Sequence, residues 1–217
     1  MKSIRITFTL LAIAFVGHTT TRAQDPLPSW NDGPAKQAIV DFVRTTTGIG
    51  GARFVSPEER IATFDQGGTL WVEHPIYSQE MYCLEHVPVL AREKPELKDG
   101  KPILTKEPKL LLNDNDTGKP EGIHLMIGRR PYAAFGNSTG DQQMLEYTKA
   151  GDGARLSMLV LHDDTEREYA YGPAQGLPDS KVGTFTQALY DEAKKDGWFV
   201  ISMKNDWKVI FPFELGK

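Results

Sequence analysis

A carboxylate inside a glycine turn is the feature of this sequence most suited to chemistry. A short apolar run, residues 61–64, ends directly at Asp65, and Gly67 and Gly68 follow. The glycines allow the backbone to approach whatever Asp65 holds. Open α/β sheets bind their ligands at the carboxyl ends of their strands. The pattern therefore predicts a buried strand over residues 61–64 that delivers Asp65 into a site.

A second polar turn follows another apolar stretch. Residues 132–135 have the composition of a short buried strand, and the polar turn that follows runs from Gly136 through Asn137 to Asp141. Taken alone, this turn is explained by N-capping of the next helix. In a doubly wound sheet, however, both turns open on the same edge. We therefore interpret the two turns as parts of one functional site.

The two turns resemble motifs I and IV of the haloacid dehalogenase superfamily, most of whose members are phosphatases. Motif I is an apolar strand followed by Asp-x-Asp-Gly-Thr, which residues 65–69 match except at Gly67. Motif IV is an apolar strand, Gly-Asp-Ser, two residues and Asp, which residues 136–141 match except at Asn137. The resemblance extends over residues 55–97 and 101–212. It implies a Rossmann-like parallel α/β sheet with helices on both faces and a truncated helical cap.

The resemblance also implies a role for each site residue. Asp65 would attack a small phosphorylated substrate and form an aspartyl-phosphate. Mg²⁺ would be held by Asp65, the carbonyl of Gly67 and Asp141. Weaker substrate contacts are implied for Gly68, Thr69 and Asn137.

Lys119 stands where the family places the lysine that offsets the charge of the nucleophile and the phosphoryl group. It stands at the start of a helix predicted over residues 120–127, directly before Pro120. A positive charge is electrostatically unfavourable at a helix start, which favours a functional role. A solvated surface lysine is the alternative interpretation.

Two departures from the family pattern lead to a second hypothesis. Gly67 replaces the acid that protonates the leaving group, a contribution of about 10²–10⁴-fold in rate. Motif II is missing between Thr69 and Lys119, and the chain is shortened near residues 97–101. The alternative is a non-catalytic protein that keeps a phosphate or metal pocket.

Dehalogenases also lack that acid, but they do not use this motif IV. Loss of a core strand would uncover the sheet, which a rearranged or oligomeric fold would protect.

Residues 1–23 have the basic start, short apolar run and small-residue cleavage site of a signal peptide. We expect export, most naturally to a bacterial periplasm, with no membrane anchor later in the chain. Residues 24–217 then form a single domain with 22 basic and 29 acidic side chains, a formal charge of −7. This acidic balance argues against nucleic-acid binding. The single cysteine, Cys83, excludes an intramolecular disulfide and is predicted to be buried on a helix.

Alternating strands and helices predict a parallel sheet. Helices are expected over residues 34–45, 71–97 with an interruption at Pro88, 120–127, 142–147 and 182–195; strands are expected over 61–64, 132–135, 157–161 and 198–203. Residues 24–33 are expected to be loose, 71–100 to be the cap remnant, 98–101 a turn and 103–112 strands around it.

Further polar residues follow the predicted strands. Glu73 and His74 lie where the family's cap begins, a place that often touches substrate, and we interpret His74 as a helix-boundary residue. His162, Asp163 and Asp164 follow the strand 157–161. A metal cluster there is one interpretation, and a solvated acidic loop is the one we expect.

Overall fold

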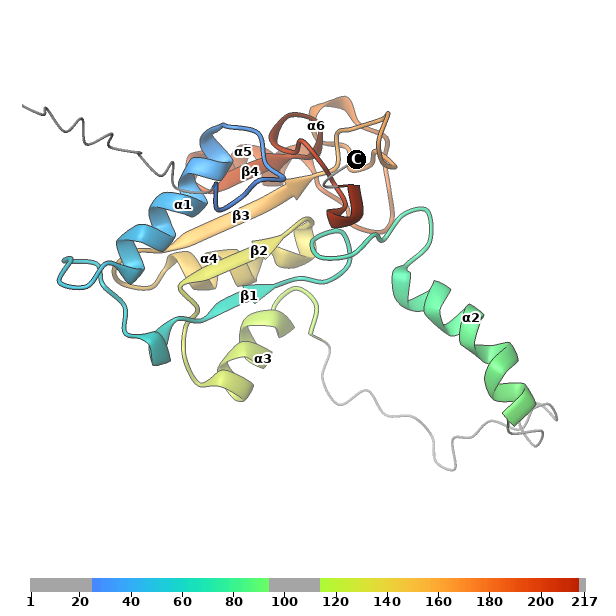
Figure 1. The fold of residues 1–217 in the computed structure, drawn as a ribbon, viewed down its shortest axis with the longest axis horizontal. Helices are drawn as coiled ribbons and strands as arrows, with labels where there is room; N and C mark the ends of the chain where they lie inside the picture. Colours follow the sequence, from blue (N-terminus) through green and yellow to red (C-terminus); the bar gives the residue numbers. More distant parts are fainter. Residues whose placement is uncertain (1–24, 94–113, 215–217) are drawn as a thin grey trace, which may run out of the picture.

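The computed structural model describes residues 25–93 and 114–214, which form an α/β structure (Figure 1). Its single sheet of four parallel strands has the order β1-β2-β3-β4. The strands are β1 (Ala62–Phe64), β2 (Ala133–Gly136), β3 (Leu156–Leu161) and β4 (Phe199–Ser202). The predicted parallel α/β sheet is confirmed, and all four expected strands agree with the observed ones to within one or two residues.

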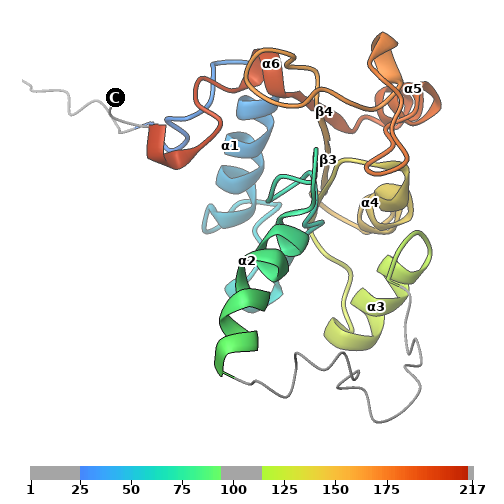
Figure 2. The ribbon, with the colours of Figure 1, turned by 90° about the vertical axis from the view of Figure 1, so that its right-hand side faces the viewer.

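Helices cover both faces of the sheet (Figure 2). One face carries α1 (Pro34–Thr47), and the other carries α4 (Gln142–Lys149) and α5 (Gln187–Lys195), with α3 (Gly118–Ile127) packed beside α4. Short helices complete the described chain: α6 (Met203–Asp206) and the single turns Pro57–Glu59, Thr139–Asp141, Ala174–Gly176 and Pro212–Glu214. The last predicted helix begins at Gln187 instead of residue 182. Thr186 caps this helix, because its side chain accepts a hydrogen bond from the N–H of Leu189.

The side chains of the central strands divide between two hydrophobic cores. All six residues of β3 are buried, as expected for a parallel strand covered on both faces. Met158 and Val160 pack with Trp30 and Ile201 on the α1 side, and alternate residues enter the other core. That second core contains Leu159, Leu161, Leu145, Phe185, Leu189 and Trp198. The period of two along each strand is what separates these two cores.

Strand β1 lies at an edge of the described sheet. Its register places Phe64 opposite Phe135 of β2, and the two rings stack at 4.5 Å. Ala62 and Phe64 are exposed, and the Phe64 side chain retains 45% of its accessible area. The strand that holds Asp65 is therefore paired on one side only within the described residues.

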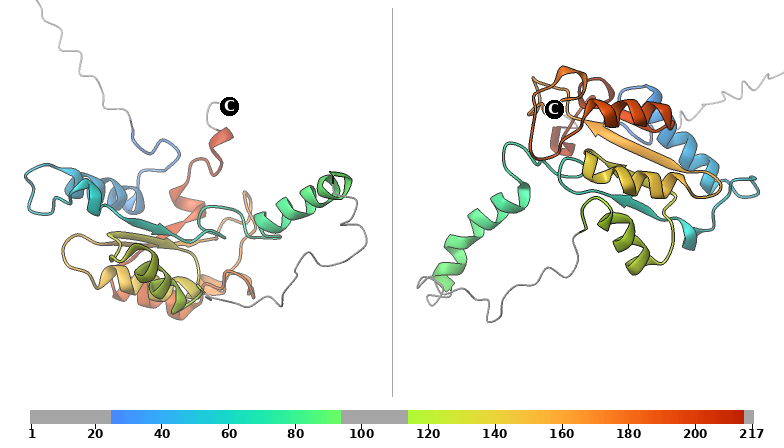
Figure 3. Two further views of the ribbon diagram at one scale, coloured as in Figure 1. Left: turned by 90° about the horizontal axis from the view of Figure 1, so that it is seen from below. Right: turned by 180° about the vertical axis from the view of Figure 1, so that it is seen from behind.

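The segment expected to be the cap remnant differs from the prediction. Among its described residues, the helix α2 (Ser78–Glu93) begins seven residues later than expected and runs through Pro88 without ending. Cys83 lies on α2 and is exposed, so the prediction of a buried cysteine is wrong. Helix α2 extends away from the sheet (Figure 3), which explains why the side chains of Met81, Leu84 and Leu90 are exposed.

The lead-in before α1 is also better ordered than predicted. Trp30 is 8% exposed, its ring lies tilted against that of Trp207 with centroids 4.3 Å apart, and the two residues form an antiparallel bridge. Lys36 bonds Asp25 at 2.7 Å. The expectation of a loose segment is therefore wrong for residues 25–33, because Trp207, far along the chain, and Lys36 of α1 hold it.

Some predictions lie outside the described residues. These are the signal peptide over 1–23, the turn at 98–101 and the strands within 103–112. Within the described ranges, no helix has both the length and the hydropathy needed to cross a membrane.

Candidate functional site

The carboxyl end of β1 holds Asp65 beside β2. Its backbone N–H donates to the carbonyl of Phe135 at 2.9 Å, which continues the strand pairing by one residue. The chain then turns sharply, with the N–H groups of Leu70 and Trp71 both donating to the carbonyl of Gln66. Gly68 has φ 71°, and a Cβ there would lie 2.0 Å from Asn137 Nδ2. Only glycine fits this position, because both the backbone conformation and the space exclude a side chain.

Three predicted site residues from three segments meet at this edge. Lys119 Nζ donates to Asp65 Oδ1 and to Asp141 Oδ1, each at 2.5 Å. Lys119 is supplied by the first turn of α3, and Asp141 by the polar turn after β2. The predicted functional role of Lys119 thus gains a geometric basis, because its ammonium lies between the two carboxylates that the motifs single out.

Asp141 is the most rigidly held member of this cluster. Its side chain is fully buried, and Oδ2 accepts from the N–H of Asn137 at 2.9 Å and the N–H of Ser138 at 3.0 Å. Ser138 Oγ adds a third hydrogen bond at 3.1 Å. Since Oδ2 is fully used in fixing the turn, Oδ1 is the oxygen left to face Lys119 and the site.

Electrostatics leave the cluster short of positive charge. Burial and then the charge of Asp141 raise the pKa of Asp65, against the opposing effect of Lys119. Burial acts to lower the pKa of Lys119, but the two aspartates outweigh it and the pKa is raised. Two carboxylates share one ammonium, so a further cation would relieve the repulsion between them.

The donor set suits a magnesium ion. Asp65 and Asp141 offer hard carboxylate oxygens, and Mg²⁺ is usually bound by one or two carboxylates together with several waters. Within the part of the chain that the structure describes, no group of three or more His, Cys, Asp or Glu side chains could hold a metal ion. The two carboxylates would suit an ion that needs few protein ligands.

A second polar cluster lies against the first and was not predicted. Glu73 is 6% exposed, and its Oε1 accepts from Tyr171 Oη and from Asn137 Nδ2, both at 2.6 Å. Burial and then the charge of Glu73 raise the pKa of Tyr171 far above its usual value. Asn137 therefore links the two clusters, because its N–H donates to Asp141 and its amide group donates to Glu73. Nothing in the local sequence pattern pairs Glu73 with Tyr171, because the contact joins residues 98 positions apart.

His162 and Asp164 correct the prediction of a solvated loop after β3. His162 is 9% exposed, and its Nε2 donates to the carbonyl of Gly68 at 2.7 Å. Its Nδ1 bonds Glu168 at 2.8 Å, and its ring stacks on Tyr171 at 4.5 Å. Asp164 is 4% exposed and paired with Arg167. His162 and Asp164 are therefore buried, and His162 contacts the glycine turn through the carbonyl of Gly68.

The remaining predicted residues lie in or next to the glycine turn. Gly67 follows Asp65 by two residues, and Thr69 Oγ1 is a buried hydroxyl with no hydrogen-bond partner among the described residues. His74 is not a helix-boundary residue, because α2 begins at Ser78. Its Nε2 instead lies 3.1 Å from the carbonyl of Val182 and 3.0 Å from Ser180 Oγ.

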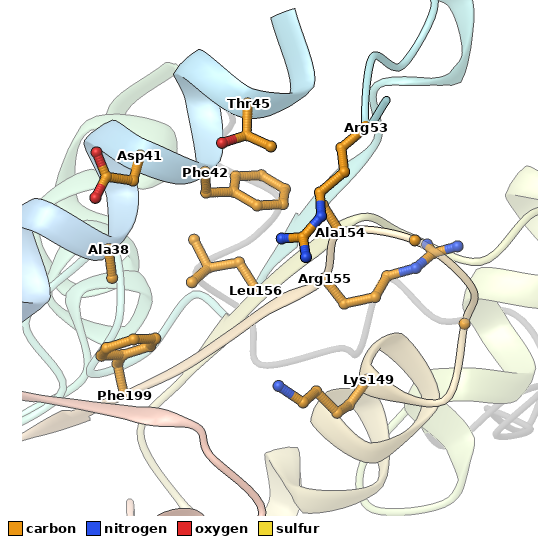
Figure 4. Close-up of a pocket in the computed structure, with 12 residues that line it drawn as sticks. Ala38, Asp41, Phe42, Thr45, Arg53, Lys149, Ala154, Arg155, Leu156 and Phe199 are labelled. Atoms are coloured by element: carbon orange, nitrogen blue, oxygen red, sulfur yellow. The ribbon is translucent and has the colours of Figure 1, made fainter. Parts of the chain in front are cut away.

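A separate hollow of about 470 Å³ lies at the opposite end of the sheet (Figure 4). Leu156 and Phe199, the first residues of β3 and β4, line it together with Phe42, Arg53 and Lys149. It contains none of the residues around Asp65. The predicted chemistry is therefore located at the carboxyl edge of the sheet, away from this hollow.

Comparison with known proteins leaves the function to be argued from the site itself. No protein-family model matches the chain, and no curated protein matches it significantly.

Proposed function

We propose that this chain is a Mg²⁺-dependent phosphomonoester hydrolase of the haloacid dehalogenase type, with Asp65 as its nucleophile. The observation that carries the proposal is the position of Lys119 Nζ, 2.5 Å from both Asp65 and Asp141. The three residues that this chemistry requires come together at the carboxyl edge of the parallel sheet, where α/β sheets place their sites. The proposal includes export, on the evidence of the signal-like residues 1–23.

In the proposed reaction Asp65 attacks the phosphorus atom of a phosphomonoester and forms an aspartyl-phosphate, which water then hydrolyses. Lys119 holds positive charge beside the carboxylate that attacks and the phosphoryl oxygens that gather charge. Asp141 keeps Lys119 in place through Oδ1. A Mg²⁺ ion bound by Asp65 and Asp141 would add the remaining charge stabilisation.

A second candidate is a non-catalytic protein that binds phosphate or metal in the same pocket. Gly67 favours it, because the position two residues after the nucleophile carries no acid. The edge position of β1 favours it as well, since no described strand supports Asp65 on its outer side. The two candidates share the pocket and differ in turnover.

A thermal melt of the chain from residue 24 onward, with and without Mg²⁺ plus beryllium fluoride, tests the pocket. Beryllium fluoride mimics the aspartyl-phosphate, and a ligand that binds only the folded state raises the midpoint. At a ligand concentration 100-fold above its dissociation constant, we expect a rise of about 5–10 °C.

The Asp65→Asn variant should lose this shift, whereas Asp41→Asn, on the exposed face of α1, should keep it. An unshifted wild-type melt would reject both candidates. A shift accompanied by Mg²⁺-dependent release of phosphate from p-nitrophenyl phosphate supports the hydrolase. A shift without phosphate release supports the binding protein.

A further inference from the structure

The missing acid at position 67 is the weakest point of the proposed hydrolase. A leaving alkoxide needs a proton, and the water that attacks the aspartyl-phosphate needs a base. Gly67 provides neither. The inference below rests on the proposed function and concerns which side chain supplies this proton transfer.

Glu73 fills the place where a side chain of residue 67 would stand. A Cβ added to Gly67 would lie 3.0 Å from Glu73 Oε2 and 3.5 Å from Glu73 Cβ. Tyr77 Cε1 would also lie 3.5 Å away. Burial, then the charges of Glu73 and Asp65, raise the pKa of Tyr77, so both carboxylates lie close to this one ring.

The two oxygens of Glu73 have different surroundings. Oε1 accepts from Tyr171 and Asn137 and packs against Gly183, where a Cβ would come within 1.9 Å. Among the described residues, no hydrogen bond to Oε2 and no ion pair of Glu73 is found. Because Oε1 is occupied by two donors, Oε2 is the oxygen left to contact a substrate. That oxygen is the one directed at position 67.

We infer that Glu73 replaces the missing aspartate at position 67 as the acid–base residue of the proposed hydrolysis. In the first step Asp65 bonds to phosphorus, the bond from phosphorus to the leaving oxygen breaks, and Glu73 Oε2 gives its proton to that oxygen. In the second step water bonds to phosphorus and gives a proton to Glu73, and the electron pair of the breaking bond returns to the Asp65 carboxylate. The products are an alcohol and inorganic phosphate.

The test compares wild type with Glu73→Gln, which keeps the shape and removes the transferable proton. With p-nitrophenyl phosphate, whose leaving group needs no proton, the variant should release one nitrophenolate per chain and then turn over about 10²–10⁴-fold more slowly. Intact-protein mass should show one retained phosphoryl group. With an alkyl phosphate, the variant should show no burst. Glu192→Gln, which removes a carboxylate on α5 that accepts from Gln142 and from no other side chain among the described residues, should behave as wild type.

Rescue separates an acid–base role from a structural one. Gly67 does not have a positive φ, so its backbone accepts aspartate. Glu73→Ala vacates the space beside it, and Gly67→Asp in that background should restore turnover. The inference is overturned if Glu73→Gln turns over like wild type, or loses both steps without retained phosphate, while wild type remains active. Those results leave the proposed hydrolase standing. A wild type that hydrolyses no phosphomonoester overturns both, and its response to beryllium fluoride then decides whether the binding pocket survives.

Discussion

Lys119 is the residue on which the electrostatics of the site depend. Its ammonium is the only cation that the described structure places within hydrogen-bonding distance of Asp65 and Asp141. Removing one partner of a buried ion pair leaves an uncompensated charge, which costs far more than the pair itself contributes. The stability of the metal-free chain and the binding of Mg²⁺ are therefore linked through this residue.

We expect Lys119→Met to lower the free energy of unfolding by about 3 kcal/mol without metal, because Asp65 and Asp141 then repel each other. Mg²⁺ should recover most of this loss, since it takes the place of the missing charge. Urea unfolding with and without Mg²⁺ measures both effects.

Lys36→Met is the matched control for that measurement. Lys36 also bridges two aspartates, Asp25 at 2.7 Å and Asp32 at 2.9 Å. Asp32 is 92% exposed, so water already solvates it and Mg²⁺ should restore nothing. Equal rescue of both variants would show that the ion does not act at Asp65.

At the scale of elements, the loop after β3 is tied to the chain after β4. Asp164 accepts from the N–H groups of Glu166 and Arg167 and pairs with the Arg167 guanidinium. Arg167 in turn donates to the carbonyls of Met203 and Trp207, at 2.7 and 2.9 Å. This connection also supports His162, and through it the glycine turn of the site.

The stabilisation from Asp164 should depend on pH. Burial acts to raise the pKa of Asp164, but the Arg167 pair and the two backbone donors outweigh it and hold the pKa below its usual value. A lowered pKa stabilises the fold above the unfolded value, about 3.9, and the effect disappears as pH falls through the folded value. Asp164→Asn should melt several degrees below wild type at pH 7, and the gap should close below about pH 4. Asp191→Asn, exposed on α5, should show no gap at either pH.

At the scale of the whole molecule, the edge strand β1 and the helix α2 present apolar side chains to solvent. Phe64, Leu70 and Trp71 are 45%, 62% and 42% exposed. An unprotected strand edge with apolar neighbours favours pairing with another chain. The shortened sequence led us to predict an oligomer, and we expect the edge of β1 to be its interface.

We expect Phe64→Lys to weaken self-association by about tenfold, because a charge on an edge strand opposes edge-to-edge pairing. Light scattering behind size exclusion, over a dilution series, measures the change. Ile49→Lys is the control: Ile49 is 94% exposed in the loop after α1, far in sequence from β1. A monomer at every concentration in wild type would contradict the prediction.

Much of the fold and part of the site followed from local sequence patterns. The apolar runs predict the four strands, and each predicted strand ends close to where the observed one ends. A parallel strand that is covered on both faces consists of consecutive apolar residues, which the sequence shows directly. The turns that hold Asp65 and Asp141 were found for the same reason. The predictions failed where burial depends on a distant partner. Trp30 is buried because it meets Trp207, and Cys83 is exposed because α2 extends away from the sheet.

The sequence by itself determined the strand-and-turn units, the acidic charge and the two aspartates suited to metal and phosphoryl chemistry. Only the tertiary structure placed the ammonium of Lys119 between Asp65 and Asp141, since the same lysine on the surface would have an identical sequence environment. Only the tertiary structure brought Glu73 against Tyr171 and Asn137, beside Gly67. The physical reason is that periodicity encodes which residues a segment buries, whereas the partner that meets them is selected by the packing of segments far apart in the chain.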